Sequence, residues 1–224
     1  MRKKQPILLL LLTLSHFMAF GQVTSFTLDP EKINKQLASK LDSLFQEDQG
    51  SRLKLSTLQK EKASEKQIDS LRASMRSKDS TNLIFAQELI DRYGWLGPEE
   101  VGFQGAQALF LVIQHANLNI QKKYYPLILE AEKNGKILSS NVAILEDRIA
   151  VREGRHQTYG SQGYYDRDRK KLIIYPLKDV IHLDSLRHSR GLPNMKDYIK
   201  DWDLQDYNAY LPYAQELLKK HIGL

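Results

Sequence analysis

The chain contains no cysteine, and this absence excludes several structures and chemistries together. Without thiols there are no disulfides, no thiolate metal ligands, no cysteine nucleophiles and no lipid attached to a cysteine. The fold must therefore be held by core packing, which 224 residues with 42% hydrophobic content allow.

Long apolar runs are scarce, and the mean hydropathy of −0.47 excludes an integral membrane protein. The one leucine-rich run, residues 7–14, follows a basic start at residues 2–4 and precedes small residues at 19–21. This order is typical of a secretory signal peptide, and the run is too short for a good membrane span. We expect residues 1–21 to be removed on export, leaving Gln22 first and no membrane segment; the alternative is an uncleaved anchor.

A strong excess of one charge is also lacking. The formal net charge is +6, but loss of residues 1–21 leaves 30 Lys and Arg against 27 Asp and Glu, a net charge of +3. That excess is too weak to predict nucleic acid or anionic lipid as a partner. No P-loop, GxGxxG or GxSxG motif is present either, so no nucleotide, dinucleotide or serine hydrolase site is predicted.

The first part of the exported chain, residues 22–79, is predicted to be an N-terminal helical arm. Apolar residues recur at helical spacing over residues 31–48, after Asp29-Pro30 as a start and before Gln49-Gly50-Ser51 as a break. Mixed charge over residues 52–79 favours a solvated helix or a short helical hairpin. Self-association through the helices of residues 31–79 is one expectation for this arm.

The rest, residues 80–224, is predicted to be one globular domain with several helices and few strands. A helix capped by Asp79-Ser80-Thr81 opens it, a turn surrounds Trp95, and Ser139 or Ser140 caps a later helix. The helices are expected at residues 103–118, 124–133 and 139–152, with strand-like pieces at 158–159 and 172–175. The predicted fold is mainly α with a small β-hairpin (α+β): a compact helical domain plus the N-terminal arm.

The helix at residues 103–118 carries no formal charge. On a helical wheel, Gln104, Gln107, Gln114 and His115 share an arc of roughly 100°, and the other directions are apolar. A solvated face normally carries Lys or Glu, so we predict a largely buried helix whose polar arc needs hydrogen-bond partners. Those partners are either a ligand or the protein's own backbone.

Asp147 lies between apolar directions of the helix at residues 139–152, which predicts a partly buried and therefore paired carboxylate. As a functional residue it would orient His115 or bind substrate; the alternative is a structural ion pair between helices. Arg148 lies about 100° away on the same helix, so the partner of Asp147 is expected to be another base or a backbone donor.

Gln157, Tyr159 and Ser161 would share one face of a strand, and Gln162 would join them if the strand bends at Gly160. Polar side chains beside glycine can bind a polar ligand, and the alternative is an ordinary strand end with a turn. The histidines at 182 and 188 lack the spacing of metal ligands, and no HExxH motif occurs. We therefore expect no metal and no cofactor.

Four runs, in this order and spacing, resemble a bacterial family without known function, catalogued as domain of unknown function 6624. They are Gly94-Trp95, Gln114-His115-Ala116, Leu145-Glu146-Asp147-Arg148 and Gln157-Thr158-Tyr159-Gly160-Ser161-Gln162. The resemblance covers about residues 80–200 and implies no activity and no catalytic residue. The leader ending Phe-Gly-Gln is similar to those of exported proteins from Gram-negative, Bacteroidota-type bacteria, which implies a periplasmic or secreted location.

Three hypotheses for function remain open. In the first, the protein binds a polar small molecule, sugar or peptide in a cleft lined by Gln, His, Asp and Tyr. In the second, it is a metal-independent hydrolase or lyase with His115 as general base and Asp147 as its orienting group. In the third, the polar cluster is a closed hydrogen-bond network with a structural role. The candidate ligand-binding residues are Gln107, Gln114, Arg148, Gln157, Tyr159 and Gln162.

Overall fold

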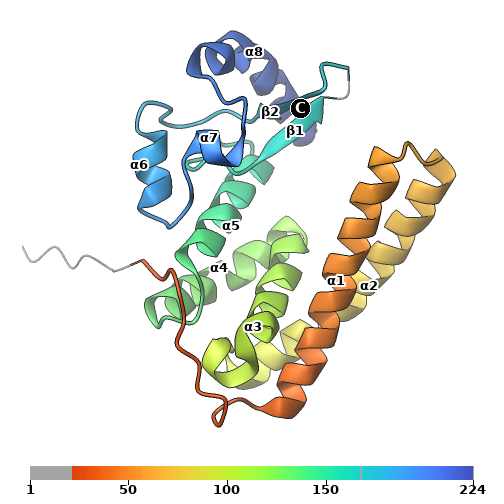
Figure 1. Ribbon diagram of the computed structural model, residues 1–224, viewed down its shortest axis with the longest axis vertical. Coiled ribbons are helices and arrows are strands. Elements are labelled where there is room, and N and C mark those ends of the chain that lie inside the picture. Colours follow the sequence, from red (N-terminus) through yellow and green to blue (C-terminus); the bar gives the residue numbers. More distant parts are fainter. Residues whose placement is uncertain (1–21, 167, 224) are drawn as a thin grey trace, which may run out of the picture.

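The computed structural model describes residues 22–166 and 168–223, and the predicted signal peptide lies outside them. Helices dominate, with one small antiparallel sheet (Figure 1). The elements are α1 (Lys35–Lys60), α2 (Glu65–Tyr93), α3 (Pro98–His115), α4 (Leu118–Lys133), α5 (Ser139–Arg152), β1 (Gly163–Asp166), β2 (Lys171–Ile174), α6 (Leu183–His188), α7 (Met195–Tyr198) and α8 (Leu204–His221). The expected fold class, mainly α with a small β-hairpin, is confirmed.

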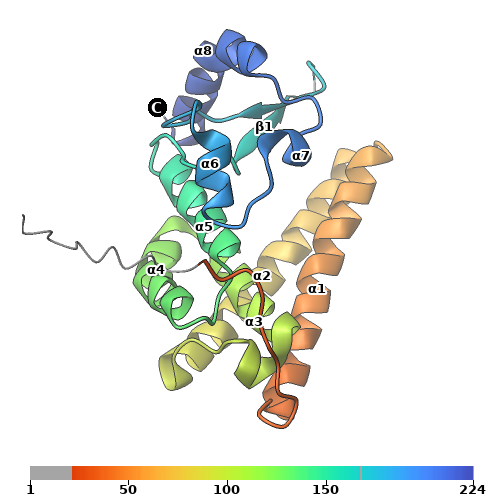
Figure 2. The same cartoon turned by 60° about the vertical axis from the view of Figure 1, so that its left-hand side comes forward.

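The elements form two groups joined by α5. In Figures 1 and 2, α1 and α2 form a long antiparallel hairpin beside α3, and α4 lies on the other side of α3. The sheet and α6, α7 and α8 gather at the far end of α5. Contacts between α1 and α3, α2 and α3, and α4 and α5 hold the first group together.

Helix α1 begins later and ends later than the sequence pattern predicts. The Asp29 side chain accepts the Glu31 amide in a turn instead of capping the helix, and the capping residue is Asn34, whose side chain accepts from the Leu37 amide. The predicted break at residues 49–51 is wrong, because α1 continues through Gly50 to Lys60. One glycine costs a helix interior only about 1 kcal/mol, which packing against α2 and α3 outweighs.

Helix α2 begins at a capping box in which Ser64 and Gln67 satisfy each other's backbone amides. It pairs with α1 across a turn at residues 61–64. Of the two alternatives for residues 52–79, a solvated helix or a short helical hairpin, the structure has a hairpin, but its two helices are long and extend beyond this range. The predicted cap at residues 79–81 is wrong, since α2 runs through this point to Tyr93. Ser80 donates its hydroxyl to the Arg76 carbonyl one turn earlier instead of capping a new helix.

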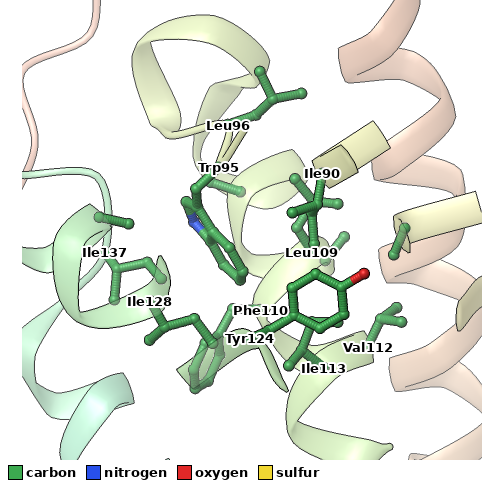
Figure 3. Packing of buried hydrophobic residues seen from close by; sticks show 14 of the residues in the cluster. Ile90, Trp95, Leu96, Leu109, Phe110, Val112, Ile113, Tyr124, Ile128 and Ile137 are labelled. Atoms are coloured by element: carbon green, nitrogen blue, oxygen red, sulfur yellow. The ribbon is translucent and has the colours of Figure 1, made fainter. Parts of the chain in front are cut away.

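The main core surrounds α3, which is largely buried as predicted. Figure 3 shows Trp95, Phe110 and Tyr124 packed together between α3, α4 and the turn before α3. At Gly105 an added Cβ would lie 3.3 Å from Leu41 Cβ, so this glycine lets α1 approach α3 closely. Leu41 and Leu44 of the predicted arm belong to this core. The helix begins at Pro98, earlier than expected, with a kink at Gly102.

The β-hairpin uses a different first strand from the one predicted. Strand β1 pairs with β2 in antiparallel register, with Gly163 opposite Ile174 and Asp166 opposite Lys171. Thr158 and Tyr159 are not in a strand, because Asp147 takes both their backbone amides and leaves none for a sheet partner. The prediction of a strand at residues 158–159 is therefore wrong, whereas the one at 172–175 is confirmed for residues 172–174.

The segment before α1 crosses the molecule and docks on α5. Val23 donates its amide to the Ser139 hydroxyl at 2.8 Å, and the Ser139 amide donates back to the Val23 carbonyl at 3.0 Å. The predicted capping role of the serines is therefore wrong: Ser139 is the first helical residue and binds this segment, and Leu138 precedes it. Among residues 22–166 and 168–223, no helix is long and apolar enough to cross a membrane.

Candidate functional site

Asp147 is fully buried on α5 and accepts three backbone amides from the loop after it. The Thr158 amide lies 2.7 Å from Oδ1, the Tyr159 amide 3.0 Å from Oδ1, and the Ser161 amide 3.0 Å from Oδ2. Burial raises the pKa of Asp147, and these hydrogen bonds oppose that rise. Of the two partners that the sequence allowed, a base or backbone donors, the structure has the backbone donors.

Gln157 and Gln162 form a closed amide pair beneath the same loop. The Gln157 side chain is fully buried; its Nε2 donates to the carbonyls of Gln162 and Tyr175, and its Oε1 accepts the Gln162 amide at 2.8 Å. The Gln162 side chain donates to the Ser161 hydroxyl at 3.0 Å. Gln157 thus uses its donor and acceptor groups within the protein, which leaves little for a ligand.

Arg187 completes this loop network, and the sequence analysis missed it. It is 1% exposed and donates to the carbonyls of Tyr159 and Pro193, each at 2.6 Å. An arginine among Leu183, Leu186 and Leu192 was the signal that could have revealed a buried cation. Tyr159 packs here with its ring buried, and burial raises the pKa of its phenol to about 12. The phenol is therefore neutral at physiological pH.

The glutamines of α3 do not converge on the Asp147 loop. Gln107 accepts a hydrogen bond from the Asn141 side chain of α5 at 3.0 Å, and Gln104 is exposed. Gln114 is buried, and its backbone carbonyl accepts the Gln121 side chain of α4 at 2.5 Å. The predicted polar arc is thus divided between packing contacts and solvent.

His115 pairs with Asp48 of α1, a partner that the sequence analysis missed. Its Nδ1 is buried and lies 3.5 Å from Asp48 Oδ1, at ion-pair distance but without hydrogen-bond geometry. Asp48 also accepts Arg52 Nη2 at 2.8 Å and the Gln49 side chain at 2.7 Å. Asp48 follows Leu41 and Leu44 at helical spacing, so its position on the apolar face of α1 was a usable signal.

The electrostatics of this pair keep Asp48 ionised. Burial opposes its ionisation, but the contacts with His115 and Arg52 outweigh burial, so the pKa of Asp48 lies well below its ordinary value of 3.8. The imidazole and the carboxylate are close enough to interact electrostatically. No contact joins His115 to Asp147 among the described residues, so the predicted pair of catalytic candidates is not brought together.

A pocket of about 300 Å³ opens beside His115, where α1 and α2 meet the end of α3. Its walls include Asp48, Asp79, Asn82, His115 and Asn117. The two carboxylates share Arg52, whose Nη2 lies 3.3 Å from Asp79. This pocket can hold a small polar molecule, with hydrogen-bond donors and acceptors from three helices.

Other candidate groups do not assemble a metal site. Among the residues that the structure describes, no group of three or more histidine, aspartate or glutamate side chains is placed to hold a metal ion. His182 lies 2.8 Å from Asp179 on the surface. Arg148 is partly buried on α5 and touches neither His115 nor Asp147.

Comparison with known proteins gives one match. The model of the Family of unknown function (DUF6624) matches residues 36–210. No curated protein and no solved structure matches the chain. The match extends beyond the resemblance at residues 80–200 and includes α1, which carries Asp48.

Proposed function

Since the chain belongs to DUF6624, a family of unknown function, we propose its function from its own geometry: it binds a polar small molecule, sugar or peptide in the pocket beside His115. The observation that carries this proposal is the buried pair of His115 and Asp48 at the pocket wall. Buried polar groups at an open hollow provide the convergent hydrogen bonds that small ligands need.

The contacts of the Asp147 loop favour the third hypothesis, a closed hydrogen-bond network with a structural role, but only for the residues of that loop. Asp147, Gln157 and Arg187 are satisfied by backbone groups, so they stabilise the loop rather than bind a ligand. The ligand site that we propose therefore lies at the α1, α2 and α3 junction.

The binding proposal is tested with a thermal-shift screen of sugars, short peptides and nucleotides. A ligand raises the melting temperature, and Asn82→Ala in the pocket wall should abolish that rise. Asn119→Ala, an exposed asparagine of α4, is the matched control and should keep it. If no compound stabilises the protein, or if both variants respond like the wild type, the pocket is not the binding site.

A hydrolase or lyase with His115 as general base is the second candidate, and the contact with Asp48 favours it. The Asp48 carboxylate lies 3.5 Å from Nδ1 of His115, close enough to become the orienting partner of a general base when a substrate binds. In this case His115→Gln removes hydrolysis of chromogenic esters, whereas Asn82→Ala mainly raises KM. Turnover that survives in His115→Gln rejects the enzyme hypothesis.

Export of the chain is part of the proposal. The basic start, leucine-rich run and small residues of positions 1–21 support cleavage before Gln22 and a periplasmic or secreted location. Mass spectrometry of the protein purified from an exporting Gram-negative host should find Gln22 at the N-terminus. Self-association through residues 31–79 stays a prediction, and the exposed Leu53 of α1 is the apolar side chain there to examine first.

A further inference from the structure

Arg148 is the charged group that the contacts above do not explain. It lies partly buried on α5, and its Nε is buried without a hydrogen-bond partner. It makes no ion pair with a carboxylate in the described part of the chain. Arg187 is also buried, but two backbone carbonyls accept hydrogen bonds from its guanidinium group. A buried cation without an anion is costly.

A second arginine on the same face of α5 raises the free-energy cost of burying the Arg148 cation. Arg152 lies one turn after Arg148, so the two cations are neighbours on the helix. Arg152 donates to the Ala116 carbonyl at 2.6 Å and also lacks a carboxylate partner among the described residues. Burial, and then the positive charges of Arg152 and Arg52, lower the pKa of Arg148 to about 10. Arg148 and Arg152 therefore carry positive charge without a carboxylate partner among the described residues, whereas Arg52 is paired with Asp48 and Asp79.

Arg152 and Arg52 bond to groups of the pocket wall, and Arg148 lies close enough to both to feel their charges. Ala116, whose carbonyl binds Arg152, lies in the pocket wall. Arg52 bonds to Asp48 and Asp79, which also lie in the wall, so the acids of the pocket are already paired. Arg148 and Arg152 keep guanidinium hydrogens for another acceptor. The planar fork of arginine matches the two oxygens of a carboxylate or a phosphoryl group.

We propose that Arg148, with Arg152 and Arg52, binds the anionic group of the ligand, a carboxylate or a phosphoryl group. This inference rests on the proposed function, since it names the chemical class of the molecule that the pocket holds. It also assigns Arg148 a role that differs from a structural one. The anion would supply the negatively charged partner that Arg148 does not find among the described residues.

The test measures thermal unfolding of the full chain in about 10 mM phosphate, and separately succinate, against chloride of equal ionic strength. We expect at least one of the two anions to raise the melting temperature of the wild type by about 2–4 °C. The rise should vanish in Arg148→Met and persist in Arg92→Met, an exposed arginine of α2. Which anion acts identifies the phosphoryl or the carboxylate class.

Stability without anion separates a binding role from a structural one. In chloride, Arg148→Met should unfold at or above the wild-type temperature, because an apolar side chain replaces an unpaired cation. If Arg148→Met does not fold, Arg152→Met replaces it and should also lose the anion effect. No rise with either anion, or a rise unchanged in both variants, overturns the inference. The neutral-ligand screen with Asn82→Ala tests the pocket separately, because phosphate alone reports only on the arginines.

Discussion

Asp147 has no solvent exposure, and the backbone amides of one loop compensate for the burial of its carboxylate. Its two oxygens accept three amides of residues 158–161, so loop and helix are held by a single side chain. Arg187 donates to the carbonyls of Pro193 and Tyr159 and does not line the pocket beside His115. These two residues attach the loop to α5 and α6.

Asp147→Asn should destabilise the protein strongly. The asparagine NH₂ group would face amide donors, and each donor left unpaired costs about 1–3 kcal/mol. Urea unfolding measures the loss, and Asp201→Asn, an exposed aspartate, should change the free energy of unfolding by less than about 0.5 kcal/mol. Equal stability of the two variants would contradict the network.

The pairing of Asp48 predicts a dependence of stability on pH. The pKa of Asp48 in the folded protein lies below its ordinary value of 3.8. The stability that this shift contributes is therefore fully present above the ordinary pKa, and it is lost as the pH falls from 3.8 toward the folded pKa. Urea unfolding from about pH 6 to about pH 3 should therefore show wild type and Asp48→Asn converging in stability at acidic pH. A difference that stays constant over this range would show that Asp48 is not ion-paired.

At the scale of elements, two glycines in helices have opposite roles. Gly102 in α3 has φ 72° and ψ 168°, a conformation that residues with a Cβ rarely adopt, whereas Gly50 lies within regular α1. Neither would bring an added Cβ within 4 Å of another group, so conformation alone decides the effect of a substitution.

Gly102→Ala should lower the free energy of unfolding by about 1–3 kcal/mol through backbone strain. Gly50→Ala should raise it by about 0.5–1 kcal/mol through better helix propensity and a more restricted unfolded chain. Chemical denaturation measures the free energy of unfolding of both variants. A Gly102→Ala variant as stable as the wild type, or more stable, would contradict the positive φ at Gly102.

At the scale of the whole molecule, the N-terminal segment connects distant elements. Val23 bonds to Ser139 of α5, Phe26 lies 6.2 Å from Phe103 of α3 between ring centres, and the Asn34 amide donates to the Glu100 carbonyl. The segment thus extends from α5 to the start of α1.

A chain that starts at Asp29 should be less stable than one that starts at Gln22 by about 2 kcal/mol, from two lost hydrogen bonds at about 1 kcal/mol each. Guanidinium unfolding compares the two chains. Ser139→Ala in the longer chain should reproduce only part of the loss, because the Ser139 backbone amide still donates to Val23. Identical stability of both chains would show that the segment is not docked.

Local patterns predicted that helices form and that α3 is buried, because periodicity depends only on neighbouring residues. They did not give every helix end, since α3 ends at His115 and α4 already begins at Leu118. They failed at Gly50 and Ser80, where contacts between α1 and α2 outweigh weak local breaks. They also failed at Thr158, because the acceptor that removes it from a strand, Asp147, lies on a preceding helix.

The sequence alone determined the fold class, the uncharged buried helix and the need of Asp147 for hydrogen-bond donors. Only the tertiary structure decided that His115 meets Asp48 and that Arg148 has no carboxylate partner within residues 22–166 and 168–223. The reason is that side-chain partners depend on which helices pack together, and the close approach of α1 to α3 at Gly105 is a long-range contact that no local pattern encodes.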